Sequence, residues 1–224
     1  MLINFLVVCI ALLHAANVII LPGGERFENL LYDLRVKLTL PGGVDERIVI
    51  VDIDEHSLRE EGHWPWSRSK LAALTDQLFD KYEIATLGFD VVFAEKEENR
   101  EIDALREVAR KRGRTSFIAE LDDMAAGLDR DLRFAQALVD RPITLGYYFN
   151  INPERTENSG MLPAPLSFDD SVKNALVPPR GCSYGANIKP LQSSVASAGF
   201  FSNPLLGPDG IVRRVPTVHE SEGC

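Results

Sequence analysis

The chain begins with an almost uninterrupted apolar segment. From residue 1 to 21 the polar residues are Asn4, His14 and Asn17. A helix of about 20 such residues is long enough to span the roughly 30 Å hydrocarbon core of a bilayer. A signal peptide would carry basic residues at its start and a small-residue cleavage site, and neither is evident here. We therefore predict an uncleaved membrane anchor over residues 1–22, with a signal peptide or a buried core helix as alternatives.

Apolar residues after this segment recur at helical and strand spacings in turn. A helical spacing over 25–40 predicts a stalk helix, so that stalk and linker occupy residues 23–43. The run at 48–51 is continuous and β-branched, which is typical of a strand buried on both faces of a parallel sheet. Strands that alternate with helices indicate an α/β fold around a mostly parallel sheet. The further elements that we predict are strands over 85–93, 115–121 and 143–149 and helices over 67–82, 99–112 and 128–140.

The last third of the chain has a different pattern. Residues 151–190 contain six prolines and little periodicity, which predicts a long irregular excursion. Two short strands, 198–203 and 211–218, follow, and the Pro-Asp-Gly sequence at 208–210 between them is typical of a tight turn. We expect an antiparallel hairpin at an edge of the sheet, because the second strand carries a proline that cannot donate a backbone hydrogen bond. Sheet, flanking helices and hairpin make up one domain over residues 44–224.

The charged residues begin where the apolar N-terminal segment ends. Acidic residues number 33 and basic residues 24, which gives a net charge of −9, and all of them lie after residue 24. An acidic domain without clustered Lys and Arg argues against a nucleic-acid partner. Hydrophobic residues at 45% and charged residues at 25% are ordinary for a globular domain, which excludes a disordered tail.

The cysteines and histidines show no metal-ligand spacing, and we expect neither a metal nor a cofactor. Cys9 lies within the apolar segment. Cys182 and Cys224 either form a disulfide in an oxidising compartment or remain two unrelated thiols.

Aspartates follow two of the predicted strands. Asp52 and Asp54 come after the first strand, and Asp90 comes within the next apolar run. Ligands of parallel sheets bind beyond the carboxyl ends of the strands, so Asp54 and Asp90 are candidates for a ligand-facing edge. Such carboxylates could also hold a cation, act in acid–base or nucleophilic catalysis, or cap the helix that follows.

Both tryptophans of the chain lie in the loop after the first predicted strand. Trp64, Trp66 and Arg68 could form an aromatic wall with an anion-binding guanidinium at the ligand-facing edge. The alternative is that the indoles close the sheet edge by packing and that Arg68 pairs with Asp54 or Asp90. The candidate ligand-binding residues are thus Asp54, Trp64, Trp66, Arg68 and Asp90.

A phosphohydrolase is the enzymatic alternative. An apolar strand that ends in Asp52-x-Asp54 is similar to the nucleophile loop of haloacid-dehalogenase-type phosphatases. That pattern has Thr or Val two places after the second aspartate, where this chain has His56. It also needs a Gly-Asp-x-x-x-Asp element, which the sequence lacks. We therefore expect no catalytic residues and no enzymatic activity of this chain's own.

A series of short motifs follows in a fixed order along the chain: YDLR at 32–35, IVIVDIDEHSL at 48–58, GHWPWSR at 62–68, GFDVVF at 88–93, GFF at 199–201 and DGIVRRVP at 209–216. As a set, these motifs resemble the CHASE domain of the second type, an extracytoplasmic sensory module of bacterial transmembrane receptors. The resemblance covers about residues 28–218. His63 stands where that family usually has Arg, and Asp52 occupies a position that is more often small.

The resemblance implies a sensory input domain of a receptor in the bacterial inner (plasma) membrane, with the domain in the periplasm. The output would be an adenylate or guanylate cyclase, a histidine kinase or a Ser/Thr kinase, and the chain would end at Cys224 before the final part of the domain. A homodimer and an unknown small-molecule or stress ligand are further expectations. A scaffold that only holds receptor dimers together is the remaining alternative.

Overall fold

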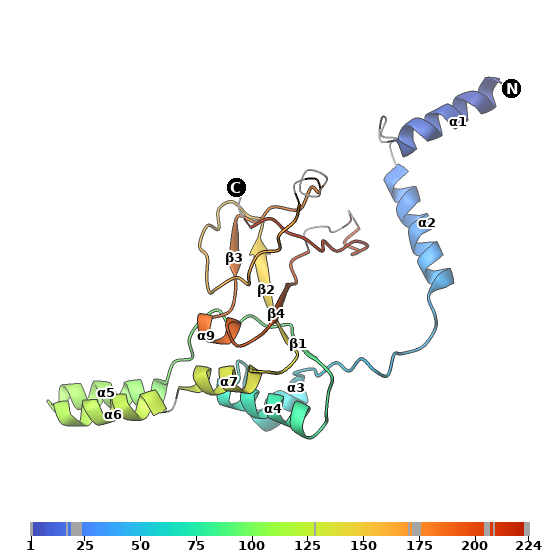
Figure 1. The fold of residues 1–224 in the computed structure, drawn as a ribbon. Helices are drawn as coiled ribbons and strands as arrows, with labels where there is room; N and C mark the ends of the chain where they lie inside the picture. The colour runs from blue at the N-terminus through green and yellow to red at the C-terminus, as the bar shows by residue number, and fades with distance from the viewer. Residues whose placement is uncertain are drawn as a thin grey trace. The chain divides into compact units, whose positions relative to one another are not determined.

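The computed structural model describes residues 2–16, 18, 24–127, 129–169, 171, 176–203, 207 and 209–221 (Figure 1). The chain divides into two units, Met1–Asp54 and Glu55–Cys224.

The N-terminal unit contains the helices α1 (Leu2–Ala15) and α2 (Gly24–Thr39). α2 confirms the predicted stalk helix. α1 covers part of the predicted membrane anchor (1–22), of which residues 1, 17 and 19–22 lie outside the described residues. Among the residues that the structure describes, no helix combines the length and the apolar composition needed to cross a membrane, so the structure does not support the predicted span.

The β-branched run at residues 48–51 does not form the predicted strand. Its side chains are between 55% and 86% exposed, and the Ile48 N–H donates to the Asp45 carbonyl oxygen in a turn (3.0 Å). A strand forms only where a neighbour pairs with its backbone N–H and C=O groups, and no strand of the described sheet pairs with this run. The prediction of a buried strand at residues 48–51 is therefore wrong.

The second unit is built around a four-stranded mixed sheet, counted over the described residues. β2 (Ile143–Asn150) lies at its centre, where β1 (Leu87–Phe89) and β4 (Ser197–Phe200) pair with it in parallel. β3 (Ser183–Gly185) pairs antiparallel with the last residues of β2. The predicted α/β class is confirmed, and β1, β2 and β4 fall within or overlap predicted strands.

Several helices of this unit begin where the sequence predicts them. Ser67 precedes α4, and its hydroxyl accepts the Lys70 N–H at 3.3 Å, as expected for an N-cap. α4, α5 and α7 confirm predicted helices, whereas α3 and α9 are short additions. The helices are α3 (Glu55–Glu61), α4 (Arg68–Asp80), α5 (Arg100–Lys111), α6 (Thr115–Gly127), α7 (Arg130–Leu138) and α9 (Lys189–Gln192).

Residues 115–121 begin helix α6 and do not form the predicted strand. α6 packs against α5, with Ile102, Ala109 and Leu121 buried between them. Ile118 and Leu121 are three residues apart and therefore share a helix face, which a short apolar run can also present as a strand. Packing against α5 favours the helix over the strand for this segment.

The predicted antiparallel hairpin is also wrong. β4 is paired in parallel with β2, and residues 211–218 form no strand. The turn itself is present: Gly210 has φ +75°, its N–H donates to the Gly207 carbonyl oxygen, and the Asp209 carboxylate accepts the Ile211 N–H. The predicted turn therefore forms without the second strand of the hairpin.

In its described residues, the long segment between β2 and α9 is largely irregular, as its prolines predict, and contains β3. Cys182 within it forms a disulfide. Cys224, the partner that the sequence suggests, lies outside the described residues.

Two apolar clusters meet along one strand. Ile143 and Leu145 of β2 belong to the main core, which α4, α7 and α9 cover. Tyr147 and Phe149, further along the same strand, belong to a second cluster. All four residues are at odd positions and so lie on one face of the sheet. β2 therefore connects the helix-covered core to the second cluster.

Candidate functional site

The two tryptophans lie close together beside the main core. Their ring centroids are 6.1 Å apart in an edge-to-face arrangement. Trp66 packs against the core and its Nε1–H donates to the Gly62 carbonyl oxygen at 2.8 Å. Trp64 is 38% exposed. Trp66 is therefore packed against the core and Trp64 is partly exposed, so the two indoles do not form a wall of two exposed ring faces.

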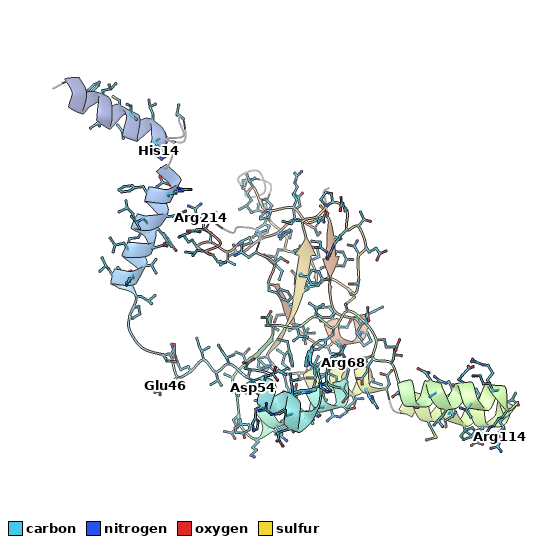
Figure 2. All side chains as sticks on the ribbon, turned by 180° about the vertical axis from the view of Figure 1, so that it is seen from behind. His14, Glu46, Asp54, Arg68, Arg114 and Arg214 are labelled. Atoms are coloured by element: carbon cyan, nitrogen blue, oxygen red, sulfur yellow. The ribbon has the colours of Figure 1, made fainter. Side chains whose placement is uncertain are left out.

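Arg68, labelled in Figure 2, is the first residue of α4. Its side chain is held by buried partners. Its Nε donates to Asp131 Oδ1 at 3.3 Å, and the two side chains are 12% and 3% exposed. The guanidinium also lies over the Phe93 ring at 4.4 Å. Asp131, which the sequence interpretation did not name, is therefore the partner that neutralises Arg68.

A second carboxylate completes this network. Glu97 accepts the backbone N–H of Arg68 at 2.6 Å and pairs with Arg130 at 2.8 Å. The Glu97 N–H donates to Asp131 Oδ2 at 2.9 Å. The network ties the first turns of α4 and α7 to the loop after β1, so its geometry is that of a structural junction.

The predicted aspartates are both exposed. Asp54 is the last residue of the N-terminal unit, directly before α3, and Asp90 directly follows β1 in the second unit. Asp52, named for the hydrolase alternative, is exposed as well. Within the described part of the chain, no group of three or more His, Cys, Asp or Glu side chains could hold a metal ion.

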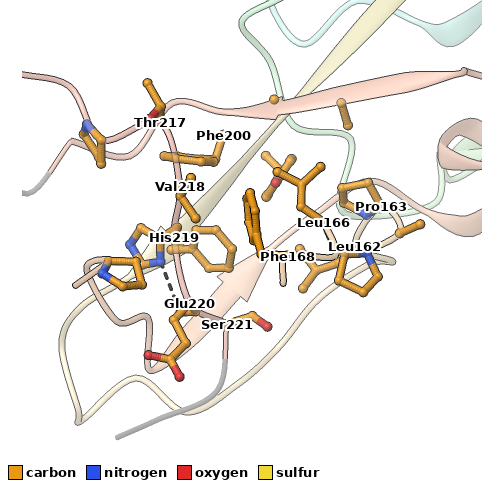
Figure 3. A pocket seen from close by; sticks show the side chains of 18 of the residues that line it. Leu162, Pro163, Leu166, Phe168, Phe200, Thr217, Val218, His219, Glu220 and Ser221 are labelled. Atoms are coloured by element: carbon orange, nitrogen blue, oxygen red, sulfur yellow. Dashed lines mark hydrogen bonds between the residues drawn. The ribbon is translucent and has the colours of Figure 1, made fainter. Parts of the chain in front are cut away.

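A cavity of about 1250 Å³ lies elsewhere in the second unit, against the second apolar cluster (Figure 3). β2 and β4 supply one wall, with Tyr147, Phe149, Ala198 and Phe200. The other walls come from three irregular segments, residues 162–168, 176–180 and 216–221. Ligand pockets commonly enclose about 300–1,000 Å³, so this cavity can hold a small organic molecule.

Aromatic rings in mutual contact form the wall of the cavity. His219 stacks on Phe149, with ring centroids 4.2 Å apart and planes at 13°, and it meets Phe200 edge to face at 5.6 Å. Tyr147 meets both phenylalanines edge to face. Such pairs stabilise one another by about 0.5–1.5 kcal/mol beyond their burial, which fixes the ring positions.

The C-terminal segment carries His219 into this wall through bonds to residues 179–181. The Gly181 N–H donates to the Glu220 carbonyl oxygen and the Glu220 N–H donates to the Pro179 carbonyl oxygen, both at 3.0 Å. Arg180 and Glu220 form an ion pair at 2.9 Å. The imidazole is therefore held by its backbone on one side and by the Phe149 ring on the other.

Two groups of the wall have shifted pKa values. Burial lowers the pKa of His219, although its hydrogen bond with the Glu220 carbonyl oxygen opposes this. Burial raises the pKa of the Tyr147 hydroxyl. Both shifts favour the uncharged form, so imidazole and phenol are neutral near pH 7.

Sequence reasoning did not find this cavity. Its residues come from five separate stretches of chain, and a lone histidine near the end of the sequence gives no signal by itself. The available sign was the alternate aromatic residues Tyr147 and Phe149 of β2 together with Phe200 of β4, because alternate residues of a strand share one face of the sheet.

Comparison with known proteins gives one match. A family model, that of the CHASE2 domain, matches residues 5–222, nearly the whole chain. Neither the curated proteins nor the solved structures contain a match.

Proposed function

The chain belongs to the CHASE2 domain family of extracellular sensory domains, and we propose that its cavity is where it receives its stimulus. The observation that carries this proposal is the cavity beside β2 and β4, lined by fixed aromatic rings and large enough for a small molecule. Sensory domains work when a ligand binds one of two conformations better than the other. A cavity wall made from a central strand suits that role.

β2 offers a route from the cavity to the helices. Tyr147 and Phe149 line the cavity, and Ile143 and Leu145 of the same strand pack in the core beneath α4 and α7. Asn187 adds a second connection, because its Nδ2 donates to the Gly146 carbonyl oxygen at 3.0 Å and its Oδ1 accepts the Phe93 N–H at 2.9 Å. A close-packed core transmits small displacements of a strand.

The finer features of the receptor are also part of the proposal. The charge-free residues 1–24 support attachment to the bacterial inner membrane, with residues 44–224 in the periplasm. The output is an adenylate or guanylate cyclase or a protein kinase, encoded with this domain, and the receptor acts as a homodimer. α2 is the connection that carries the signal on the N-terminal side.

The experiment fills the cavity and records the output. In cells that carry the native receptor gene, cyclic-nucleotide level or phosphotransfer is measured over a panel of growth conditions. Ala198→Phe puts a ring into the cavity from β4, and Ala119→Phe adds the same ring at an exposed position of α6. We expect the Ala198 variant, at normal abundance and melting temperature, to lose responses that the wild type and the Ala119 variant retain. Unaltered responses in the Ala198 variant would refute the cavity as the input site.

A further inference from the structure

We infer that the cavity binds a neutral, ring-containing molecule that donates a hydrogen bond to Nε2 of His219. This inference rests on the proposed function, which it makes more specific. Three properties of the cavity lead to it: the charge balance of its lining, the hydrogen-bonding state of His219 and the exposure of apolar side chains at its walls.

The lining offers no uncompensated charge among the described residues. Its charged side chains are Arg180 and Glu220, and these pair with each other at 2.9 Å. A charged ligand would have to break that pair or remain without a counter-ion while it lost its water. A neutral ligand meets neither cost.

The imidazole of His219 presents an acceptor. Its Nδ1 lies 3.2 Å from the Glu220 carbonyl oxygen, and a carbonyl oxygen can only accept, so Nδ1 carries the proton. Nε2 of the neutral ring is then a lone-pair acceptor. It is buried, and no donor among the described residues lies within hydrogen-bonding distance of it. A hydroxyl or N–H donor of a ligand in the cavity would satisfy it once a small shift of the ring exposes this atom.

Apolar side chains around the cavity favour a hydrophobic ligand with a flat face. Leu166 is 71% exposed and Val177 is 96% exposed, although both line the cavity. Phe149 stacks on His219, Phe200 meets it edge to face, and Phe168 points into the same space (Figure 3). A ring that entered here would find aromatic side chains to pack against and would cover exposed apolar surface.

The test compares two probes of nearly the same shape. 1-Naphthol has the hydroxyl donor and 1-methoxynaphthalene lacks it; 1-naphthoate adds a negative charge. Binding of each to the full chain is measured by isothermal titration calorimetry at pH 7.5. We expect 1-naphthol to bind about tenfold more tightly than 1-methoxynaphthalene, since a buried acceptor left unsatisfied costs about 1–3 kcal/mol and 1.4 kcal/mol is tenfold. We expect 1-naphthoate, which is ionised and also lacks a donor at this pH, to bind more weakly than 1-methoxynaphthalene because of its charge.

Substitutions assign the preference to one atom. His219→Phe keeps a stacked ring on Phe149 but has no acceptor, so it should bind both neutral probes equally. His56→Phe, at an exposed position of α3, should leave the tenfold preference intact. The comparison of the probes on the wild type needs no variant and so remains decisive if the His219 variant fails to fold.

The outcomes separate this inference from the proposed function. Equal binding of 1-naphthol and 1-methoxynaphthalene to the wild type overturns the hydrogen bond to His219 and leaves the cavity as a binding site. Tighter binding of 1-naphthoate overturns the preference for a neutral ligand. Absence of binding by all three probes overturns both the inference and the cavity as a small-molecule site.

Discussion

Asp131→Ala tests whether Arg68 is a structural residue. The substitution removes the carboxylate that neutralises a guanidinium only 12% exposed, and it removes the acceptor for the Glu97 N–H. Arg68 would then lie largely buried without its counter-ion. Loss of one partner of a buried ion pair destabilises a protein by about 3–5 kcal/mol.

The structure places the expected cost at the lower end of that range. Nη2 of Arg68 still lies 3.4 Å from the Glu95 carbonyl oxygen, and the guanidinium keeps its position over the Phe93 ring. We therefore expect a loss of about 3 kcal/mol in the free energy of unfolding. With a urea m-value of about 2–3 kcal/mol/M, the unfolding midpoint should fall by about 1 M.

Urea unfolding followed by tryptophan fluorescence is a direct assay, because both tryptophans of the chain, Trp64 and Trp66, lie just before Arg68. Asp123→Ala removes an exposed carboxylate from α6 and should change the free energy of unfolding by less than about 0.5 kcal/mol. A loss below 1 kcal/mol for Asp131→Ala would refute the structural role and would return Arg68 to the candidates for ligand binding.

Other changes test separate parts of the account. Gly160→Ala should lower the free energy of unfolding in urea by about 2–4 kcal/mol, because φ is +74° and the new Cβ would lie 2.0 Å from the Ala186 carbonyl oxygen. Gly210→Ala is the control: it has nearly the same φ (+75°) but open space around the new Cβ, and it should lose only about 1 kcal/mol. Equal losses in the two variants would refute the close approach at Gly160. Asn187→Leu should lose about 2–5 kcal/mol by thermal or urea unfolding, since it leaves two buried backbone groups unpaired, and a neutral result would contradict that. Burial lowers the pKa of His219 below its unfolded value near 6.5, so the contribution of the neutral ring to stability is complete above that value and is lost as the pH falls through the folded pKa. The unfolding midpoints at pH 8 and pH 5 should therefore differ less in His219→Phe than in the wild type. An equal pH dependence in both would refute burial as the cause.

Local signals in the sequence predict much of the second unit. The hydroxyl of Ser67 and the apolar spacing that follows it suffice for α4, because capping and amphipathicity act within one or two turns. The apolar run from Ile143 predicts β2, the strand that contacts three others. The family resemblance, which rests on the order of motifs, agrees with the family match over residues 5–222.

The errors occur where distant parts of the chain decide the structure. Residues 48–51 have the composition of a central strand, but a strand also needs a neighbour, and composition does not provide one. Residues 115–121 become a helix because α5 packs against them. The ion pair of Arg68 joins residues 63 positions apart, and His219 reaches Phe149 across 70 positions, so no local spacing could have indicated either contact.

Hydrogen–deuterium exchange of the full chain, with and without saturating 1-naphthol, tests the central claim most directly. The account predicts slower exchange of backbone amides in β4 (Ser197–Phe200) and in residues 216–221, which line the cavity. Exchange in residues 62–68, the tryptophan loop, should stay unchanged. Protection of the tryptophan loop with no change around the cavity would contradict the account and would favour the ligand-facing edge predicted from the sequence.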